Sequence, residues 1–422
     1  MSTPRGACPT LHEPMLTGDG LLVRLSPAGT GWRPAELSVL AEAAARFGSG
    51  MLEVTSRGNL QIRGLTSDSA AELAVDVEAA SIPLRTGLAI DTGPLAGIDA
   101  DEIADPLPLA RDLKQAVEAA GLFARLAPKT SIVIDGGGAL SMDDIIADVR
   151  LTADSERRGD WHVAVGGTAR TARPLESVAE ADAVSTVLAL LEAIAANGKY
   201  ARGRDLRDAD LVGFVPKTPF VATARASTPV GRFPLNDARL ATSFALPFGQ
   251  VDADTLAAFC AAVAESGAAE IRLAPGRGLI VPGLDMAACS ALESKAAALG
   301  FITDSDDPRL VIAACAGAPF CASAHFATRA LGAEIARAAP ELLAGRTLHI
   351  SGCAKRCAEP PAPDLTILGA DGGCLVLPGD GRTARPTNPV APEEALAAVR
   401  RLADTELAHE EPAARNPQPA EI

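Results

Sequence analysis

Residues 37–54 read LSVLAEAAARFGSGMLEV, and residues 256–273 read LAAFCAAVAESGAAEIRL. A constant offset of 219 residues aligns the two segments without a gap, so that Gly48 meets Gly267. Each segment has the pattern of an Ala-rich helix that ends near a glycine and is followed by a strand. Two Ala-rich units can look alike by composition alone, but an ungapped run of 18 residues favours a true duplication.

The likeness extends beyond these segments. Ser56-Arg57-Gly58 resembles residues 275–278 (PGRG) once one residue is inserted, and residues 89–93 (AIDTG) resemble residues 313–317 (AACAG). Periodicity and turn residues predict helices at 34–48, 67–81, 108–121 and 175–197, and strands at 51–55, 60–63 and 131–135. The sequence therefore predicts an α/β (α+β) fold made of two similar halves that are related by a pseudo-twofold axis.

Composition narrows the class of protein. Of the 422 residues, 48% are hydrophobic and 22% are charged, which is typical of a folded chain and excludes wholesale disorder. The 38 Lys and Arg against 53 Asp and Glu give a formal net charge of −15, so neither nucleic acid nor an anionic membrane is an expected partner. No run of about 18 apolar residues occurs, and residues 1–11 lack the apolar core of a signal peptide. We therefore expect a cytoplasmic protein.

Four of the eight cysteines lie close together in the sequence. Cys315 and Cys321 are separated by five residues, 31 residues follow, and Cys353 and Cys357 are separated by three. In a large cytosolic chain such clustering indicates metal or redox chemistry rather than structural disulfides. The remaining cysteines, Cys8, Cys260, Cys289 and Cys374, are scattered.

Two short-spaced pairs of thiolates from separate loops are what a cubane iron–sulfur cluster needs. Each pair follows an apolar run that is typical of a strand, and its small neighbours let the backbone approach the inorganic sulfide. Structural zinc is the alternative, but its ligand pairs are usually two to four residues apart, which fits the first pair poorly. Four buried thiols without a metal are the third interpretation, and the clustering makes it the weakest of the three.

The cysteine pattern near the end of a duplicated α/β chain resembles that of the sirohaem-type nitrite/sulfite reductases. Residues 55–63 (TSRGNLQIR) resemble a polar element with which this family binds the carboxylates of a tetrapyrrole. The resemblance implies substrate-binding roles for Arg57, Asn59, Gln61 and Arg63, which alternation would place on one strand face. It implies the same role for Thr55, at the start of this stretch, and for Arg277 of the second half. In isolation, the same stretch would be interpreted as a solvated edge strand.

Within this family, residues 18–24 (GDGLLVR) and 94–99 (PLAGID) look like the precorrin-3B synthase branch of aerobic cobalamin biosynthesis. The resemblance covers about residues 6–405. It implies a [4Fe-4S] cluster on the four clustered cysteines and O2-dependent conversion of precorrin-3A to precorrin-3B, with C20 hydroxylation and γ-lactone formation. It also implies a separate mononuclear non-haem iron and an external electron donor, which would be ferredoxin, flavodoxin or an NAD(P)H reductase.

The family also positions cationic groups that face a small anion. The resemblance assigns this catalytic role to Arg24, Arg85 and Lys129. At Ser131 the chain departs from the family, which has a second lysine there. One missing cation weakens the case for a dianionic substrate such as sulfite, whereas neutral dioxygen does not need it. A solvent-exposed loop lysine is an equally good interpretation of Lys129.

The resemblance implies three domains. Residues 18–81 with 237–300 would form a ferredoxin-like central domain, residues 82–225 a tetrapyrrole-pocket domain, and residues 301–405 the domain with the cluster cysteines. Residues 406–422 are polar and Pro-rich, and we expect them to be a disordered tail. Two other functions stay open: an assimilatory nitrite or sulfite reductase with bound sirohaem, and a zinc-stabilised binding protein without catalysis.

Overall fold

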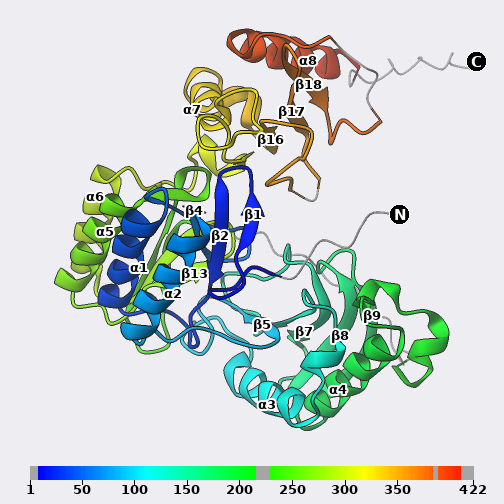
Figure 1. Cartoon of the computed structure of the whole chain (residues 1–422). Helices are drawn as coiled ribbons and strands as arrows, with labels where there is room; N and C mark the ends of the chain where they lie inside the picture. The colour runs from blue at the N-terminus through cyan, green and yellow to red at the C-terminus, as the bar shows by residue number, and fades with distance from the viewer. Residues whose placement is uncertain (1–7, 215–228, 361, 384–387, 410–422) are drawn as a thin grey trace, which may run out of the picture. The chain divides into compact units, whose positions relative to one another are not determined.

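The computed structural model describes residues 8–214, 229–360, 362–383 and 388–409 (Figure 1). The chain divides into two compact units, residues 1–305 and residues 306–422. The first unit holds both copies of the repeat together with residues 82–214, and the second unit holds the four clustered cysteines. None of the helices in the described ranges is long and apolar enough to cross a membrane.

Each copy of the repeat supplies most of the strands of one sheet. The first repeat sheet has the order β1-β2-β4-β3-β12, and the second repeat sheet has the order β10-β11-β14-β13. Their strands are β1 (Met15–Thr17), β2 (Gly20–Leu25), β3 (Met51–Val54), β4 (Leu60–Leu65), β10 (Gly231–Pro234), β11 (Leu240–Ala245), β12 (Gln250–Asp252), β13 (Arg272–Ala274) and β14 (Gly278–Leu284). All strand pairs in both sheets are antiparallel.

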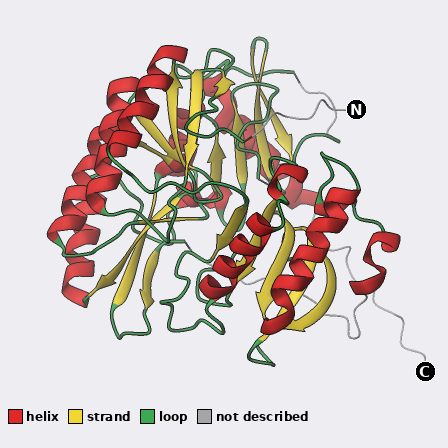
Figure 2. Cartoon of the chain, turned by 60° about the horizontal axis from the view of Figure 1, so that its bottom comes forward, coloured by secondary structure: helices red, strands yellow, loops and turns green. Residues whose placement is uncertain are grey.

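Four helices cover one face of these sheets as a separate layer (Figures 1 and 2). They are α1 (Pro34–Phe47), α2 (Ser67–Ala79), α5 (Ala253–Glu265) and α6 (Met286–Ala298). The offset of 219 carries α2 onto α6, and it also carries their N-caps onto each other. Thr66 accepts the N–H of Ser69, and Asp285 accepts the N–H of Ala288.

The two repeats share an irregularity in the strands. In the first, Leu21 pairs with Leu65 but Val23 pairs with Ile62, so one extra residue bulges from β4. In the second, Leu240 pairs with Leu284 but Thr242 pairs with Val281, which is the same shift. Gly64 and Gly283 lie in these bulges with φ of 74° and 86°, a conformation that favours glycine. A shared bulge at the same offset is strong support for the duplication.

The repeats also bind each other reciprocally. Trp32 of the first repeat forms a bridge with Ile271 of the second, and Val251 of the second pairs with Leu52 of the first. Adding 219 to Trp32 and subtracting it from Ile271 converts one pair into the other. Such mutual pairing is what a twofold relation between the copies produces.

The structure corrects the predicted insertion in the turns. The offset of 219 continues unbroken from α1 through α2, so Gly58 corresponds to Arg277. Both residues have positive φ, 74° and 69°, because both occupy the same position of a tight hairpin turn. Arg57 therefore corresponds to Gly276, and the arginines of the two turns are not equivalent.

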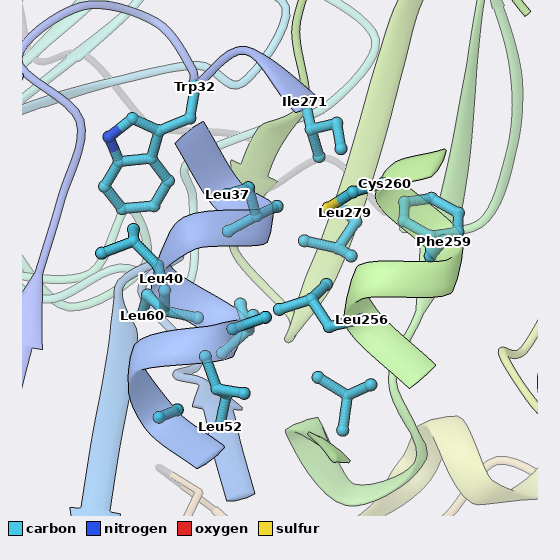
Figure 3. Close-up of a cluster of buried hydrophobic side chains, with 14 of the residues drawn as sticks. Trp32, Leu37, Leu40, Leu52, Leu60, Leu256, Phe259, Cys260, Ile271 and Leu279 are labelled. Carbon is cyan, nitrogen blue, oxygen red and sulfur yellow. The ribbon is translucent and has the colours of Figure 1, made fainter. Parts of the chain in front are cut away.

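One hydrophobic core joins the two repeats (Figure 3). In Figure 3, Leu37 of α1 and Leu256 of α5 lie between the two helices, Leu40 and Phe259 belong to the same cluster, and all four side chains are buried. Their spacing of three residues within each helix places them on the inner face, as the Ala-rich pattern requires.

Residues 82–214 add a third sheet, β5-β6-β7-β8-β9, and helices α3 (Pro106–Ala119) and α4 (Glu180–Ala196). Its strands are β5 (Ala89–Thr92), β6 (Ser131–Asp135), β7 (Ala147–Ala153), β8 (Asp160–Gly167) and β9 (Arg173–Ala179), of which the first three are parallel. The prediction of one helix over 175–197 was wrong at its start. Residues 175–179 belong to β9, because Leu175 and Val178 are buried while the strand pairs with β8.

The second unit repeats this parallel-then-antiparallel arrangement. Its sheet β15-β16-β17-β18 comprises β15 (Ile312–Ala314), β16 (Leu348–Ser351), β17 (Leu365–Ala370) and β18 (Gly373–Pro378), and only β18 is antiparallel. Its helices are α7 (Thr328–Ala338) and α8 (Ala395–His409). The predicted tail starts too early, since residues 406–409 continue α8 without a proline to stop it. Residues 410–422 lie outside the described residues.

Short 3-10 helices connect the larger elements. They lie at Phe123–Arg125, Gly203–Asp205, Asp208–Phe214, Pro247–Gly249, Pro308–Val311, Pro340–Leu343 and Pro392–Glu394.

Candidate functional site

A row of four polar side chains crosses the first repeat sheet. Arg24 on β2 pairs with Gln61 on β4, Gln61 pairs with Glu53 on β3, and Glu53 pairs with Gln250 on β12. We call these four residues the polar row. Residues next to them in the strands belong to the core under the helices, so alternation turns the polar row to the face without helices.

Arg24 and Gln250, at the two ends of the polar row, have unused hydrogen-bonding atoms. Arg24 Nε and Gln250 Oε1 are covered from solvent and have no partner among the described residues. Burial lowers the pKa of Arg24, and the charges of Cys8 and Glu53 oppose that effect. A buried polar atom without a partner costs about 1–3 kcal/mol. The face is thus ready to donate to, and accept from, a polar ligand.

Arg277 is a second half-buried guanidinium with no hydrogen bond to any residue that the structure describes. Its side chain passes over Gly249, where a Cβ would come within 2.6 Å of Arg277 Cδ. Burial lowers the pKa of Arg277, and the negative charge of Glu53 opposes this. Glu53 is therefore near two arginines, Arg24 and Arg277, that it does not pair with directly.

Arg63, by contrast, is already paired. Its Nε and Nη2 donate to the two carboxylate oxygens of Asp19 at 2.7 and 2.9 Å, and its Nη1 reaches Gln61 at 3.1 Å and Glu53 at 3.4 Å. Burial raises the pKa of Asp19, but hydrogen bonds from Arg63 and Thr17 and the charge of Arg63 hold it below its usual range. This fork binds the start of β2 to β4.

The structure corrects the placement of Arg57 and Asn59. Both lie in the hairpin turn between β3 and β4, since β4 starts only at Leu60. Thr55 closes that turn, because its hydroxyl accepts the N–H groups of Arg57 at 3.3 Å and Asn59 at 3.1 Å. Only Gln61 and Arg63 of the expected four lie on β4, and the bulge at Gly64 follows directly.

From the turn, Arg57 reaches a carboxylate on another sheet. Arg57 Nη2 donates to Asp91 Oδ2 at 2.9 Å, and Arg85 Nη1 donates to Asp91 Oδ1 at 2.6 Å. Arg85 Nη2 also lies 3.3 Å from Asn59 Oδ1, and the Ser26 hydroxyl donates to the same oxygen at 2.5 Å. Asp91 therefore brings the predicted residues Arg57 and Arg85 together, and Asn59 joins them through Arg85.

Lys129 stands apart from this group. It is half-buried just before β6, and among the described residues its carbonyl oxygen accepts a hydrogen bond from Arg202 Nη2 at 2.9 Å. No hydrogen bond or ion pair within the described ranges connects its ammonium group to Arg24, Arg57 or Arg85. Its predicted role stays a prediction.

Sequence reasoning missed several residues of this region. Asp91 lies in the segment AIDTG, residues 89–93, for which the sequence predicted no functional role. Gln250 joins the polar row through the pairing of β12 with β3. Arg150 of β7 is also buried; its Nη1 donates to the Met142 carbonyl at 3.1 Å and its Nε has no partner among the described residues. A lone arginine in an apolar strand was the signal that could have found it.

The clustered cysteines lie in loops that follow two neighbouring parallel strands. Cys315 follows β15 directly, and Cys353 follows β16 after one residue. The N–H of Gly352 donates to Cys315 Sγ at 3.2 Å, and the N–H of Cys315 donates to the Ile350 carbonyl at 3.0 Å. The two loops are thus tied together at the first sulfur.

Glycines let these loops pack closely. A Cβ on Gly352 would lie 2.7 Å from the Cβ of Ala324, and one on Gly317 would collide with Thr328. Gly317 also has a φ of 64°, which favours glycine. The Thr328 hydroxyl donates to the Cys315 carbonyl at 2.8 Å and holds the loop on α7.

The donor set suits a thiolate-bound cluster, because four sulfurs come from two adjoining loops and a backbone N–H already points at one of them. Among the described residues, no three His, Cys, Asp or Glu side chains converge closely enough to hold a metal ion. Cys315 is buried, Cys321 and Cys353 are half-buried and Cys357 is exposed.

The other cysteines have a different character. Cys260, Cys289 and Cys374 are buried in the packed parts of the fold. Burial raises the pKa of Cys260 to about 12 and that of Cys374 to about 11, so both remain protonated and act as small hydrophobic side chains.

Comparison with known proteins agrees with this architecture. The family model "Nitrite/Sulfite reductase ferredoxin-like half domain" matches residues 13–80. "Precorrin-3B synthase" of Sinorhizobium sp is 42% identical over 377 residues, which cover 88% of this chain and 82% of that protein. "Ferredoxin--nitrite reductase" of Synechococcus elongatus is 25% identical over 375 residues, covering 79% and 73%. Among solved structures, the Mycobacterium tuberculosis NirA protein matches with a TM-score of 0.71 at 20% identity, over 94% of this chain and 82% of that one.

Proposed function

The chain belongs to the nitrite/sulfite reductase family, in its precorrin-3B synthase branch, and we propose that it converts precorrin-3A to precorrin-3B in cobalamin biosynthesis. In this reaction C20 is hydroxylated and the ring-A acetate closes a γ-lactone. One atom of dioxygen enters the product, and the other leaves as water with two protons and two electrons from an external donor. The observation that carries the proposal is the 42% identity to a precorrin-3B synthase over most of both chains.

The polar face of the first repeat sheet supports a tetrapyrrole substrate. Precorrin-3A carries several acetate and propionate groups, and guanidinium groups pair with carboxylates through charge-assisted hydrogen bonds. Arg24 and Arg277 have donors to offer, because neither donates to a described residue. In our proposal these two arginines bind substrate carboxylates, while the side-chain amides of Gln61 and Gln250 complete the face.

Arg57, Arg63 and Arg85 contribute differently in this proposal. Asp19 already holds Arg63, and Asp91 holds Arg57 and Arg85. These pairs fix the guanidiniums in place before the substrate arrives, so less side-chain entropy is lost on binding. Thr55 and Asn59 act as positioning residues, since their contacts shape the turn and orient Arg85.

We propose that Cys315, Cys321, Cys353 and Cys357 hold a [4Fe-4S] cluster. When bound, such a cluster supplies single electrons. The N–H of Gly352 would stabilise negative charge on the Cys315 sulfur, and Thr328 would hold the Cys315 backbone in place. The electrons would come from a ferredoxin, a flavodoxin or an NAD(P)H reductase. For a separate mononuclear iron we assign no ligands, because among the described residues no three His, Cys, Asp or Glu side chains converge on one point.

A nitrite or sulfite reductase with bound sirohaem is the second candidate, because 25% identity to a nitrite reductase extends over most of the chain. The absorption spectrum separates the two functions. Sirohaem gives strong Soret and red bands, whereas an iron–sulfur cluster alone gives a broad shoulder in the blue. A zinc-stabilised binding protein would contain zinc and no acid-labile sulfide.

The decisive experiment uses the full chain purified without oxygen. Iron, acid-labile sulfide and the spectrum are measured first, and the protein is then given precorrin-3A, a chemical reductant and isotopically labelled dioxygen. We expect one labelled oxygen in a lactone product. Reduction of nitrite or sulfite without any oxygenated tetrapyrrole would contradict the proposal and favour the second candidate.

A further inference from the structure

Two arginines from separate loops converge on a single carboxylate at Asp91. Arg57 comes from the β3–β4 turn, Arg85 precedes β5, and each donates to a different oxygen of Asp91, at 2.9 and 2.6 Å. Two guanidiniums that each bind one oxygen form the arrangement that would hold a free carboxylate or a small oxyanion. In this chain, that place is filled by a residue of the protein itself.

Asp91 is held firmly in its charged form. The residue is 9% exposed, and burial alone raises the pKa of a carboxyl. The charges of Arg85 and Arg57 and their hydrogen bonds outweigh burial, and they hold the pKa of Asp91 below its usual range. The other contacts of the two arginines are neutral oxygens: the carbonyls of Ile146 and Ile90, the Asn59 amide and the Ser26 hydroxyl. Asp91 is thus the charged partner that the two guanidiniums share.

The second half carries no carboxylate at the position that aligns with Asp91. Residues 89–93 align with residues 313–317 of the second half, and this alignment sets Asp91 against Cys315. Both segments form or follow the first strand of a sheet whose first three strands are parallel. In the second half the aligned cysteine lies just after β15, whereas Asp91 lies within β5, where its charged partners are Arg57 and Arg85.

We propose that Asp91 determines specificity by acting as an internal anion. It fills the pair formed by Arg57 and Arg85, and it therefore excludes small free oxyanions of the nitrite and sulfite class from that pair. This inference rests on the proposed function only in placing both arginines beside the substrate site. Loss of the carboxylate would leave two half-buried guanidiniums without a counter-charge, which favours capture of an anion from solution.

The test measures binding of sodium nitrite and sodium sulfite to the anaerobic holoprotein by calorimetry at low ionic strength, where charge effects are least screened. We expect no saturable binding to the wild type and at least about a tenfold gain in affinity for Asp91→Asn, because a charge-assisted hydrogen bond is gained at each guanidinium. Asp91→Glu restores a carboxylate and should behave as the wild type does.

Asp19→Asn is the matched control. It also removes one negative charge from an arginine–carboxylate pair of the same sheet region, but it affects a single guanidinium, that of Arg63, which keeps its contacts with Gln61 and Glu53. An equal gain in Asp19→Asn and Asp91→Asn would show a general effect of charge and would overturn the proposal, as would unchanged anion binding in a folded Asp91→Asn.

A third variant covers the case in which Asp91→Asn lowers the melting temperature. The double variant Asp91→Asn, Arg57→Gln should lose the gained affinity, because the proposal needs both guanidiniums. Retention of the gain would contradict it. Conversion of precorrin-3A by the wild type is measured in parallel. Its absence would refute the proposed function, whereas the anion titrations alone decide the role of Asp91.

Discussion

The two repeats have the same backbone, but their faces without helices differ: this face carries unpartnered polar atoms in the first repeat and is packed against other residues in the second. In the first repeat this face carries the polar row, Arg24, Gln61, Glu53 and Gln250. The offset of 219 places Ser243, Ile280, Arg272 and Gly31 at the corresponding positions of the second. There, Ile280 packs with Leu95 and Leu140. Arg272 donates to the carbonyls of Pro94 at 3.2 Å and Ala96 at 3.3 Å.

The difference separates two parts of each repeat. The helix-facing residues are needed for folding, and the face without helices is available for function. The helix-facing residues are hydrophobic in both copies, because both copies build one shared core. The other face of the second repeat is covered by residues 94–98 and 140, so its polar groups are satisfied within the protein. The same face of the first repeat keeps unused donors and acceptors at Arg24 and Gln250.

The largest effect is expected where the halves differ most, at the cysteine loops. Cys353→Ser should remove cluster iron and abolish turnover, because a cubane held by three thiolates is labile to oxygen. Cys260→Ala, in the core of Figure 3, should keep both iron and activity, since this thiol only fills space. Iron analysis and turnover check both variants, and equal iron loss in the two would refute the ligand assignment.

A matched pair in the core tests the likeness of the repeats. Leu37→Ala and Leu256→Ala remove equivalent side chains that are 0% and 1% exposed. Each should lower the free energy of unfolding by about 2–5 kcal/mol, because each leaves a cavity in the shared core. Denaturant unfolding measures the change. Val75 is 67% exposed, so the control Val75→Ala should change the free energy of unfolding by no more than about 0.5 kcal/mol. A large effect in only one of the leucine variants would break the comparison.

Substitution of an arginine by Gln should affect substrate affinity on the face of the first repeat and stability on the face of the second. Arg24→Gln should weaken binding of precorrin-3A, or of a stable uroporphyrin analogue, by about ten- to a hundredfold with stability unchanged. Arg272→Gln should instead lower the free energy of unfolding by about 1–3 kcal/mol, because it leaves the carbonyls of Pro94 and Ala96 without their charged donor. Titration and thermal unfolding separate the outcomes. Unchanged affinity in Arg24→Gln would mean that Arg24 binds no carboxylate of the tetrapyrrole.

The smallest effect concerns the segment that covers the second repeat. Burial raises the pKa of Glu102 to about 7, although the N–H of Gly97 donates to its carboxylate at 2.8 Å. Between the ordinary pKa and about 7, the folded protein binds more protons than the unfolded chain, so stability falls as pH rises through this range. Glu102→Gln should flatten that loss, by about 1 kcal/mol for a half-exposed group. Melting temperatures from pH 4.5 to 8 check this, and parallel curves would contradict it.

Much of the fold could be read from local patterns. The helix at 34–48 and the strand at 131–135 lie where periodicity and turn residues predicted them, because these signals act within a few residues along the chain. The predicted start of the helix at residue 175 was wrong for the same reason, because local signals do not report strand pairing. That segment has the composition of the helix that follows, and only pairing with β8 makes it a strand.

The sequence alone determined the duplication, the two cysteine pairs and the arginine-rich turn, because offset, spacing and residue type are properties of the chain itself. The tertiary structure decided which of these groups are available. Folding brings Asp91 into contact with Arg57 and Asp19 into contact with Arg63, although each pair is far apart in the sequence. Folding also brings Gln250 into register with the polar row that contains Arg24. Pairing across such distances depends on strand register and loop path, so no local pattern distinguishes the arginines already held by a carboxylate from those still free to bind one.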